Sequence, residues 1–117
     1  MDGIGVRFSV GPQYYFMKLF FGDFKENILN FIRECGYSPI ARGVDDEWNC
    51  ARSLQGRDYP RFHCYIKKEG AGLRVNLHLD QKKPSYAGST SHSGEYEGEI
   101  IEQEGERIKQ VFARIRG

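Results

Sequence analysis

The stretch Arg61–Asp80, RFHCYIKKEGAGLRVNLHLD, carries the clearest structural pattern in the chain. Apolar and polar residues alternate on both sides of Gly70-Ala71-Gly72, which is typical of two β-strands joined by a tight turn. A turn centred on Gly70-Ala71 sets the register, because a slip of one residue would mix apolar and polar side chains on each face. The register predicts a core face made of Phe62, Cys64, Ile66, Val75, Leu77 and Leu79.

The other face of this hairpin is polar and brings together side chains that bind metals. In the predicted register His63 lies opposite His78, with Cβ atoms about 4.5–5.5 Å apart. Asp80 lies two positions beyond His78 on the same face. Because two imidazoles and a carboxylate can bind a divalent metal, we expect His63, His78 and Asp80 to be ligands of Zn or Mn. The following segment could supply His92 or Glu95 as a further ligand.

A solvated surface is the alternative interpretation, since any exposed sheet face carries polar residues at alternate positions. The residue types nevertheless favour a site. All three histidines of the chain lie in this hairpin or shortly after it.

The first functional hypothesis is a metal-dependent phosphoester hydrolase. The metal would polarise the phosphoryl oxygen and activate water, with His78, Asp80 and His92 as catalytic residues. The substrate would be nucleic acid or a phosphate-bearing small molecule. Basic and aromatic residues would bind it and neutralise its charge: Arg61, Arg74, Lys82, Lys83 and Tyr65.

Two further hypotheses use the same face. A non-catalytic nucleic-acid-binding module would stack bases on Tyr65 and Tyr86 and contact the backbone through the basic residues. A protein-interaction or oligomerising domain would bury the face against a second subunit, with Tyr14–Phe16 and Phe20–Phe21 adding apolar area. The formal net charge of +1 favours none of the three, because it produces no global field.

Short motifs also resemble the phosphoesterase domain that is attached to some DNA ligases. They occur in the order His63, His78-Leu79-Asp80, Lys83-Pro84-Ser85, His92 and Gly94–Gly98. The resemblance implies a metal site of histidine and aspartate on an all-β barrel. However, His63 and His78 are further apart in sequence than the close pair of that family, and the pattern of this chain does not predict an all-β barrel. We therefore assign no family from these motifs.

The rest of the pattern predicts an α+β domain. The expected elements are a strand at Val6–Val10, a helix at Phe24–Cys35 with a capping box at Asp23 and Glu26 and an end at Gly36, a hairpin of Ile40–Val44 with Trp48–Leu54, and a helix at Glu99–Arg116. In Tyr14–Phe21 periodicity does not distinguish a strand from the start of a helix, and the aromatic content favours a strand. Gln81–Gly98 is expected to be a loop, and loops of such length are often functional. We predict a single domain over residues 1–117. It is a two-layer sandwich, with two helices on one face of a mainly antiparallel sheet of four to six strands.

Composition and cysteine spacing indicate the broad class of protein. A chain of 117 residues with 39% hydrophobic residues can bury one core. Cys35, Cys50 and Cys64 contain no CxxC pair, which argues against a disulfide framework and a cysteine-based zinc site. We expect reduced thiols and a cytoplasmic location, because neither a signal peptide nor a membrane-spanning apolar segment is evident.

Overall fold

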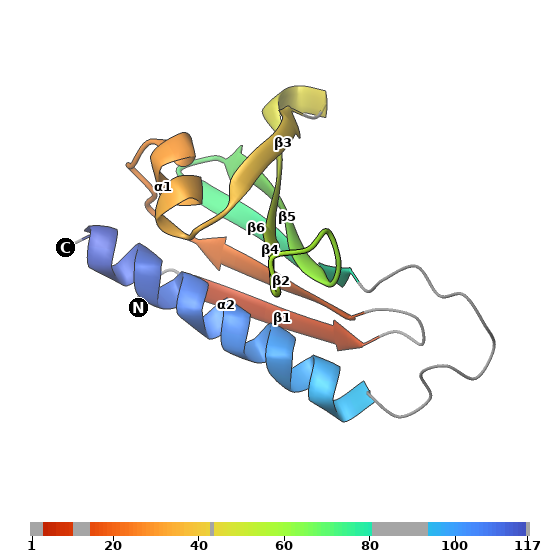
Figure 1. Cartoon of the computed structure of the whole chain (residues 1–117). Coiled ribbons are helices and arrows are strands. Elements are labelled where there is room, and N and C mark those ends of the chain that lie inside the picture. Colours follow the sequence, from red (N-terminus) through yellow and green to blue (C-terminus); the bar gives the residue numbers. More distant parts are fainter. Residues whose placement is uncertain (1–3, 11–14, 43, 81–93, 117) are drawn as a thin grey trace.

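The computed structural model describes residues 4–10, 15–42, 44–80 and 94–116. The elements are β1 (Ile4–Val10), β2 (Tyr15–Phe21), α1 (Ile28–Glu34), β3 (Ser38–Arg42), a short 3₁₀ turn (Val44–Asp46), β4 (Trp48–Ser53), β5 (Arg61–Glu69), β6 (Gly72–Asp80) and α2 (Gly94–Arg116). The strands form one open antiparallel sheet in the order β1-β2-β6-β5-β4-β3. Both helices lie on the same side of this sheet (Figure 1). The predicted two-layer α+β sandwich is confirmed, and the open sheet differs from an all-β barrel.

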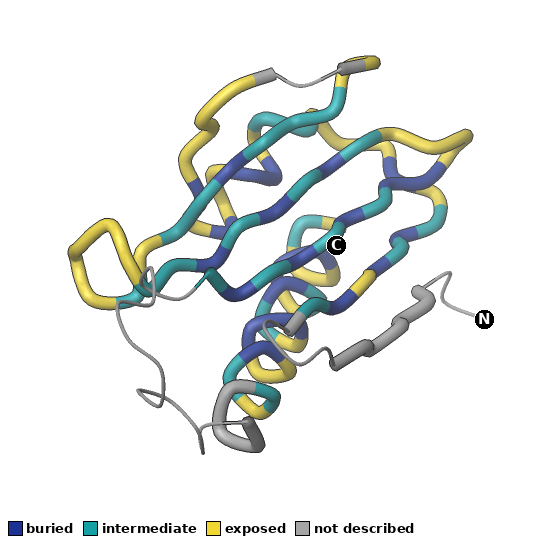
Figure 2. Tube along the Cα trace, turned by 90° about the vertical axis from the view of Figure 1, so that its right-hand side faces the viewer, coloured by how far each residue is buried: buried dark blue, intermediate teal, exposed yellow. Residues whose placement is uncertain are grey.

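The β5–β6 hairpin lies in the middle of the sheet and has the predicted register. Arg61 pairs with Asp80, His63 with His78, and the pairing continues to the turn. Gly70 has a φ of 61°, a conformation that glycine adopts without steric cost. Buried and less buried residues alternate along both strands (Figure 2). The alternation in the sequence therefore reports which face of the hairpin meets the helices.

Helix α2 covers the apolar face of β2 and β6. Phe112 stacks on Phe21 with ring centroids 4.6 Å apart. A Cβ atom at Gly105 would collide with Sδ of Met17, so the helix approaches β2 closely at this point. This close approach explains a glycine on the apolar stripe of the helix.

The first helix is shorter than predicted. It begins at Ile28, and the side chain of the N-cap residue Asn27 accepts a hydrogen bond from the backbone in the first turn at 3.0 Å. The backbone amide of Phe24 donates to the carbonyl of Ala71 at 2.8 Å, and Asp23 has a φ of 55°. The predicted capping box at Asp23 is therefore wrong, because the chain there bonds to the β5–β6 turn instead of starting a helix.

Two other boundaries differ from the prediction. Helix α2 begins at Gly94, so the predicted loop Gln81–Gly98 is wrong over its last residues. Glutamates at the start of a helix interact favourably with the helix dipole. This interaction outweighs the low helix propensity of the glycines that indicated a loop. The predicted hairpin around Asp45-Asp46 is confirmed as β3 and β4, with a register irregularity between Pro39 and Ala41. The predicted site residues Lys82, Lys83, Tyr86 and His92 lie outside the described residues.

Candidate functional site

We call the sheet surface opposite the helices the outer face. Strand registers place one row across it, in which Lys18 pairs with Asn76, Asn76 with Tyr65, and Tyr65 with Asn49. The neighbouring row runs through Phe16, His78, His63 and Ala51. The outer face therefore collects side chains from β2, β6, β5 and β4, and it includes the predicted residues Arg61, His63, Tyr65, Arg74, His78 and Asp80.

Aromatic rings form a continuous row on this face. Phe16 stacks with His78 at a centroid distance of 5.8 Å, and Tyr65 meets His78 edge to face at 5.7 Å. His63 follows at 4.7 Å from Tyr65. These distances are those of favourable aromatic pairs. We call Phe16, His78, Tyr65 and His63 the ring row. The sequence analysis named Phe16 only as apolar area for contact with a second subunit, because the apolar run that contains it does not show which side chains face outward.

Basic side chains lie on both sides of the ring row, further along the strands. Arg74 and Lys67 are register partners on the side of the hairpin turn, and Arg61 lies on the opposite side. Among the strand residues of the outer face the carboxylates are Asp80, 3.4 Å from Arg61, and Glu69, 3.0 Å from Arg74. These two acids balance the two arginines, so the outer face keeps an excess positive charge from its lysines, Lys18 and Lys67.

His63 is fixed by hydrogen bonds at both ring nitrogens. Its Nδ1 lies 3.1 Å from Oδ2 of Asp80, and its Nε2 contacts Oδ1 of Asn49. Arg61, predicted to bind substrate, contacts the same carboxylate, with its Nε 3.4 Å from Oδ2 of Asp80. A metal bound to His63 would therefore have to replace one of these protein contacts.

The outer face brings His63, His78 and Asp80 together, but their role as metal ligands stays a prediction. Over the described ranges, no group of three or more His, Cys, Asp or Glu side chains has an arrangement that could hold a metal ion. His78 stacks against Phe16 and Tyr65. Burial lowers the pKa of His78, so its ring is neutral near pH 7.

A hollow of about 430 Å³ lies at one corner of the sheet. Ser53 and Arg61 line it from the outer face, whereas Arg52 pairs with the core residue Phe62 and belongs to the helix side. The hollow forms because the pairing of β3 with β4 ends at Ser38 and Ala51, whereas β4 continues to Ser53. The connection from β4 to β5 borders it on the other side. Its lining includes Gly36, Ser38, Arg52, Ser53, Asp58 and Arg61. We call this hollow the corner notch.

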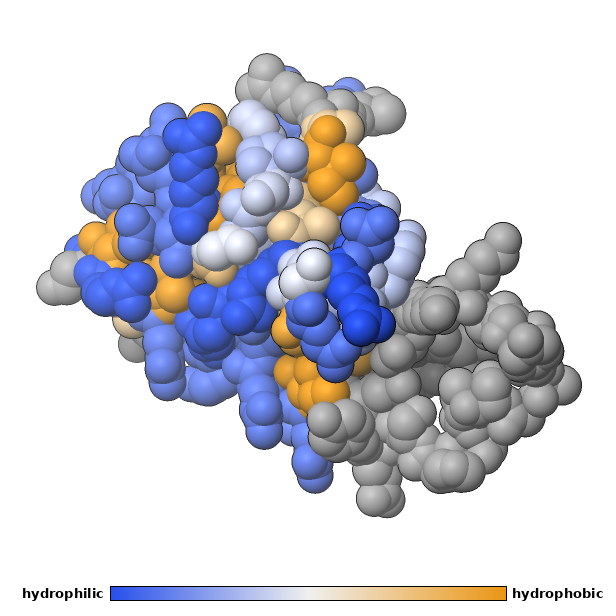
Figure 3. All heavy atoms as spheres, in the orientation of Figure 1, coloured by the Kyte–Doolittle hydropathy of each residue, from blue (hydrophilic) through white to orange (hydrophobic). Residues whose placement is uncertain are grey.

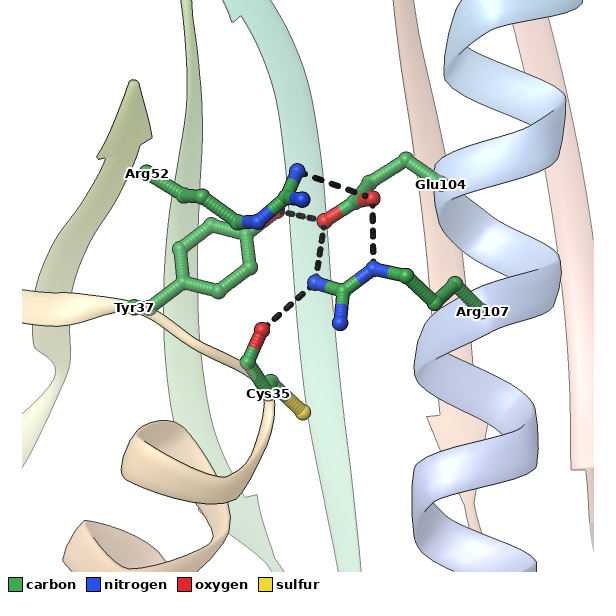
Figure 4. A network of polar contacts seen from close by, with 5 residues as sticks. All are labelled: Cys35, Tyr37, Arg52, Glu104 and Arg107. Atoms are coloured by element: carbon green, nitrogen blue, oxygen red, sulfur yellow. Dashed lines mark hydrogen bonds and ion pairs between the residues drawn. The ribbon is translucent and has the colours of Figure 1, made fainter. Parts of the chain in front are cut away.

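A buried carboxylate that the sequence analysis missed holds one of these arginines. Glu104 is 4% exposed, and it accepts hydrogen bonds from the Tyr37 hydroxyl at 2.6 Å and from Arg107 at 2.8 and 2.9 Å. Nη1 of Arg52 approaches the same carboxylate at 3.4 Å (Figure 4). The available signal was its position, since a glutamate on the apolar stripe of α2 must face the sheet. We call Tyr37, Arg52, Glu104 and Arg107 the Glu104 cluster.

The Glu104 cluster joins several elements of the fold. Arg107 also donates to the carbonyl of Cys35, at the end of α1 (Figure 4). Burial raises the pKa of the Cys35 thiol to about 12, so it stays protonated and unreactive. All three cysteines are buried free thiols in this structure. These contacts link α1, β3, β4 and α2 into one unit.

The side of the molecule that carries the helices is mostly hydrophilic. Its hydrophobic patches are small and separated (Figure 3). In the part drawn in colour, this side therefore offers no broad apolar area of the kind that marks a protein interface. Neither described helix combines the length and apolar character needed to cross a lipid bilayer.

No protein-family model matches this chain, and no curated protein and no solved structure is similar enough to it to indicate a relationship.

Proposed function

We propose that the outer face binds single-stranded nucleic acid. The observation that carries this proposal is the ring row with cations on both of its sides. Aromatic side chains on an antiparallel sheet provide surfaces on which unpaired bases stack, and each stacked base contributes roughly 1–3 kcal/mol. Cations beside such a surface attract the phosphate backbone.

The arrangement of the rings supports a strand that crosses the sheet. The ring row passes from β2 over β6 to β5, so successive bases would meet rings from successive β-strands. Lys18 lies in the same row of residues as Tyr65, and Arg74 lies one pair further toward the turn. Phosphates between the stacked bases would then lie within reach of these cations.

This proposal also accounts for the histidines without a metal. His78 and His63 are two of the four rings in the row. Because burial keeps His78 neutral near pH 7, its ring can stack without the cost of covering a charge. A nucleic-acid-binding face therefore uses both histidines in the positions that they occupy.

The test is the binding of fluorescent single-stranded oligonucleotides, measured by anisotropy. We expect affinity to fall steeply between about 50 and 200 mM salt, because counterions are released from the neutralised phosphates. Lys18→Gln should weaken binding and reduce the salt slope by about one ion. The matched control is Lys25→Gln, which removes the same charge from a side chain that is 80% exposed outside the outer face. Equal losses in both variants, or no binding at low salt, would contradict the proposal.

A further inference from the structure

We infer that the corner notch binds a phosphate group, namely the terminal phosphate of a nucleic-acid strand that lies on the outer face. This inference rests on the proposed function, because the strand brings the phosphate to the notch. The relevant ligand chemistry is a phosphate monoester, which carries more charge than the diesters inside a strand.

The position of the notch fits the end of such a strand. His63, the last ring of the row, pairs with Ala51, which lines the notch. The connection between β4 and β5 borders the notch through Asp58. Arg61 belongs to both places, since it contacts Asp80 on the outer face and also lines the notch. Its guanidinium lies 5.0 Å from the centroid of the Tyr59 ring, which helps to fix its orientation.

The donors that line the notch suit a phosphate. Arg52 and Arg61 provide planar guanidinium groups, which match phosphate oxygens in geometry and charge. Ser38 and Ser53 add hydroxyl groups, and both side chains are exposed. Gly36 has no side chain, which leaves room beside Arg52; a Cβ there would lie 3.6 Å from its Nε.

The Glu104 cluster leaves Arg52 able to bind a ligand. Arg107 donates two hydrogen bonds of 2.8 and 2.9 Å to the Glu104 carboxylate, whereas Arg52 makes one longer contact with it, at 3.4 Å. One buried carboxylate therefore faces two guanidinium groups, and the excess positive charge extends toward the notch. The side chain of Arg52 is 33% exposed, so it is partly accessible, and its guanidinium has more N–H groups than the contact with Glu104 uses.

One acidic side chain opposes this charge. Asp58 also lines the notch, and its carboxylate repels an anion that binds there. Replacing it should therefore strengthen phosphate binding, which provides a test that does not depend on removing a structural arginine.

The experiment compares oligonucleotides of one sequence that carry a 5′-phosphate, a 3′-phosphate or only hydroxyl ends. We expect one of the phosphorylated forms to bind about tenfold more tightly than the hydroxyl form, as for one added charge-assisted contact. Asp58→Asn should increase this ratio, and Ser53→Glu should abolish it by placing a negative charge in the notch. The control is Asp46→Asn, which removes an acid at the other end of the β3–β4 hairpin and should leave the ratio unchanged.

A second readout keeps this inference separate from the proposed function. Inorganic phosphate, added to the full chain at constant ionic strength, should shift the amide resonances of Gly36, Ser38 and Ser53. Equal binding of all three oligonucleotides would overturn the inference and leave nucleic-acid binding intact. If no oligonucleotide binds, the proposed function fails; shifts at those amides would then support a site for free phosphate, and their absence would overturn the notch as well.

Discussion

The two faces of the sheet each carry an arginine–carboxylate cluster, and the clusters differ in burial. On the helix side Glu104 is 4% exposed and makes contacts of 2.6–2.9 Å with Tyr37 and Arg107. On the outer face Asp80 is 31% exposed, and its contacts with His63 and Arg61 are 3.1 and 3.4 Å. A buried charge needs its partners permanently, whereas a partly exposed one can exchange them with water or a ligand. The comparison separates a structural cluster from a surface that can bind.

The largest expected effect is on the structural side. Glu104→Ala removes the acceptor shared by Tyr37, Arg52 and Arg107. We expect the free energy of unfolding to fall by about 3 kcal/mol, at the low end for breaking a buried pair because the arginines are partly exposed. Urea denaturation followed by circular dichroism measures this change, with Glu102→Ala on the exposed side of α2 as the control. If the free energy of unfolding fell no more than in the control, the Glu104 cluster would not be structural, and the contrast with the outer face would fail.

A smaller effect is expected on the outer face, and it should appear in binding. Tyr65→Leu keeps an apolar side chain of similar bulk but removes a stacking surface from the ring row. We expect the affinity for single-stranded oligonucleotides to fall about tenfold, in line with the loss of one stacked base. The unfolding free energy of the same variant is the control, and it should change much less than for Glu104→Ala. A variant that is strongly destabilised would show that Tyr65 is structural.

The smallest expected effect concerns metal. Because both ring nitrogens of His63 have protein partners, we expect nucleic-acid binding to be unchanged by a chelator. The hypothesis of a metal-dependent phosphoester hydrolase instead requires a bound metal ion in this site. Tag-free protein would then contain nearly stoichiometric Zn or Mn, and the double variant His78→Ala, Asp80→Ala would lose it with the fold intact. Elemental analysis of both proteins distinguishes the two hypotheses.

The sequence predicted the β5–β6 hairpin well because strict alternation and two glycines determine both register and faces. It placed His63, His78 and Asp80 on one face for the same reason. It did not predict the hydrogen bonds of His63, since Asn49 comes from β4 and alternation within the β5–β6 hairpin does not set the register between β4 and β5. Glu104 was missed because glutamate is usually exposed, and two of its partners, Tyr37 and Arg52, lie far from α2 in the sequence.

The start of the first helix shows a second limit. A capping-box spacing describes which local hydrogen bonds are possible, but the amide of Phe24 bonds to Ala71, far away in the sequence. Local signals therefore predicted the existence of the helix and its end at Gly36, whose φ is 85°, but not its first turn.

The strand order has a consequence for how the chain folds. Strands β3, β4, β5 and β6 each pair with their neighbour in sequence, so this meander requires only short loops to close. The pairing of β2 with β6 instead joins two segments separated by about half of the chain, and it carries a larger loop-closure entropy. We expect the meander to be ordered in the folding transition state, with the β1–β2 hairpin docking on the edge of β6 afterwards. Helix α2, which lies across β2 and β6, would then complete the core by covering the junction where the two parts meet.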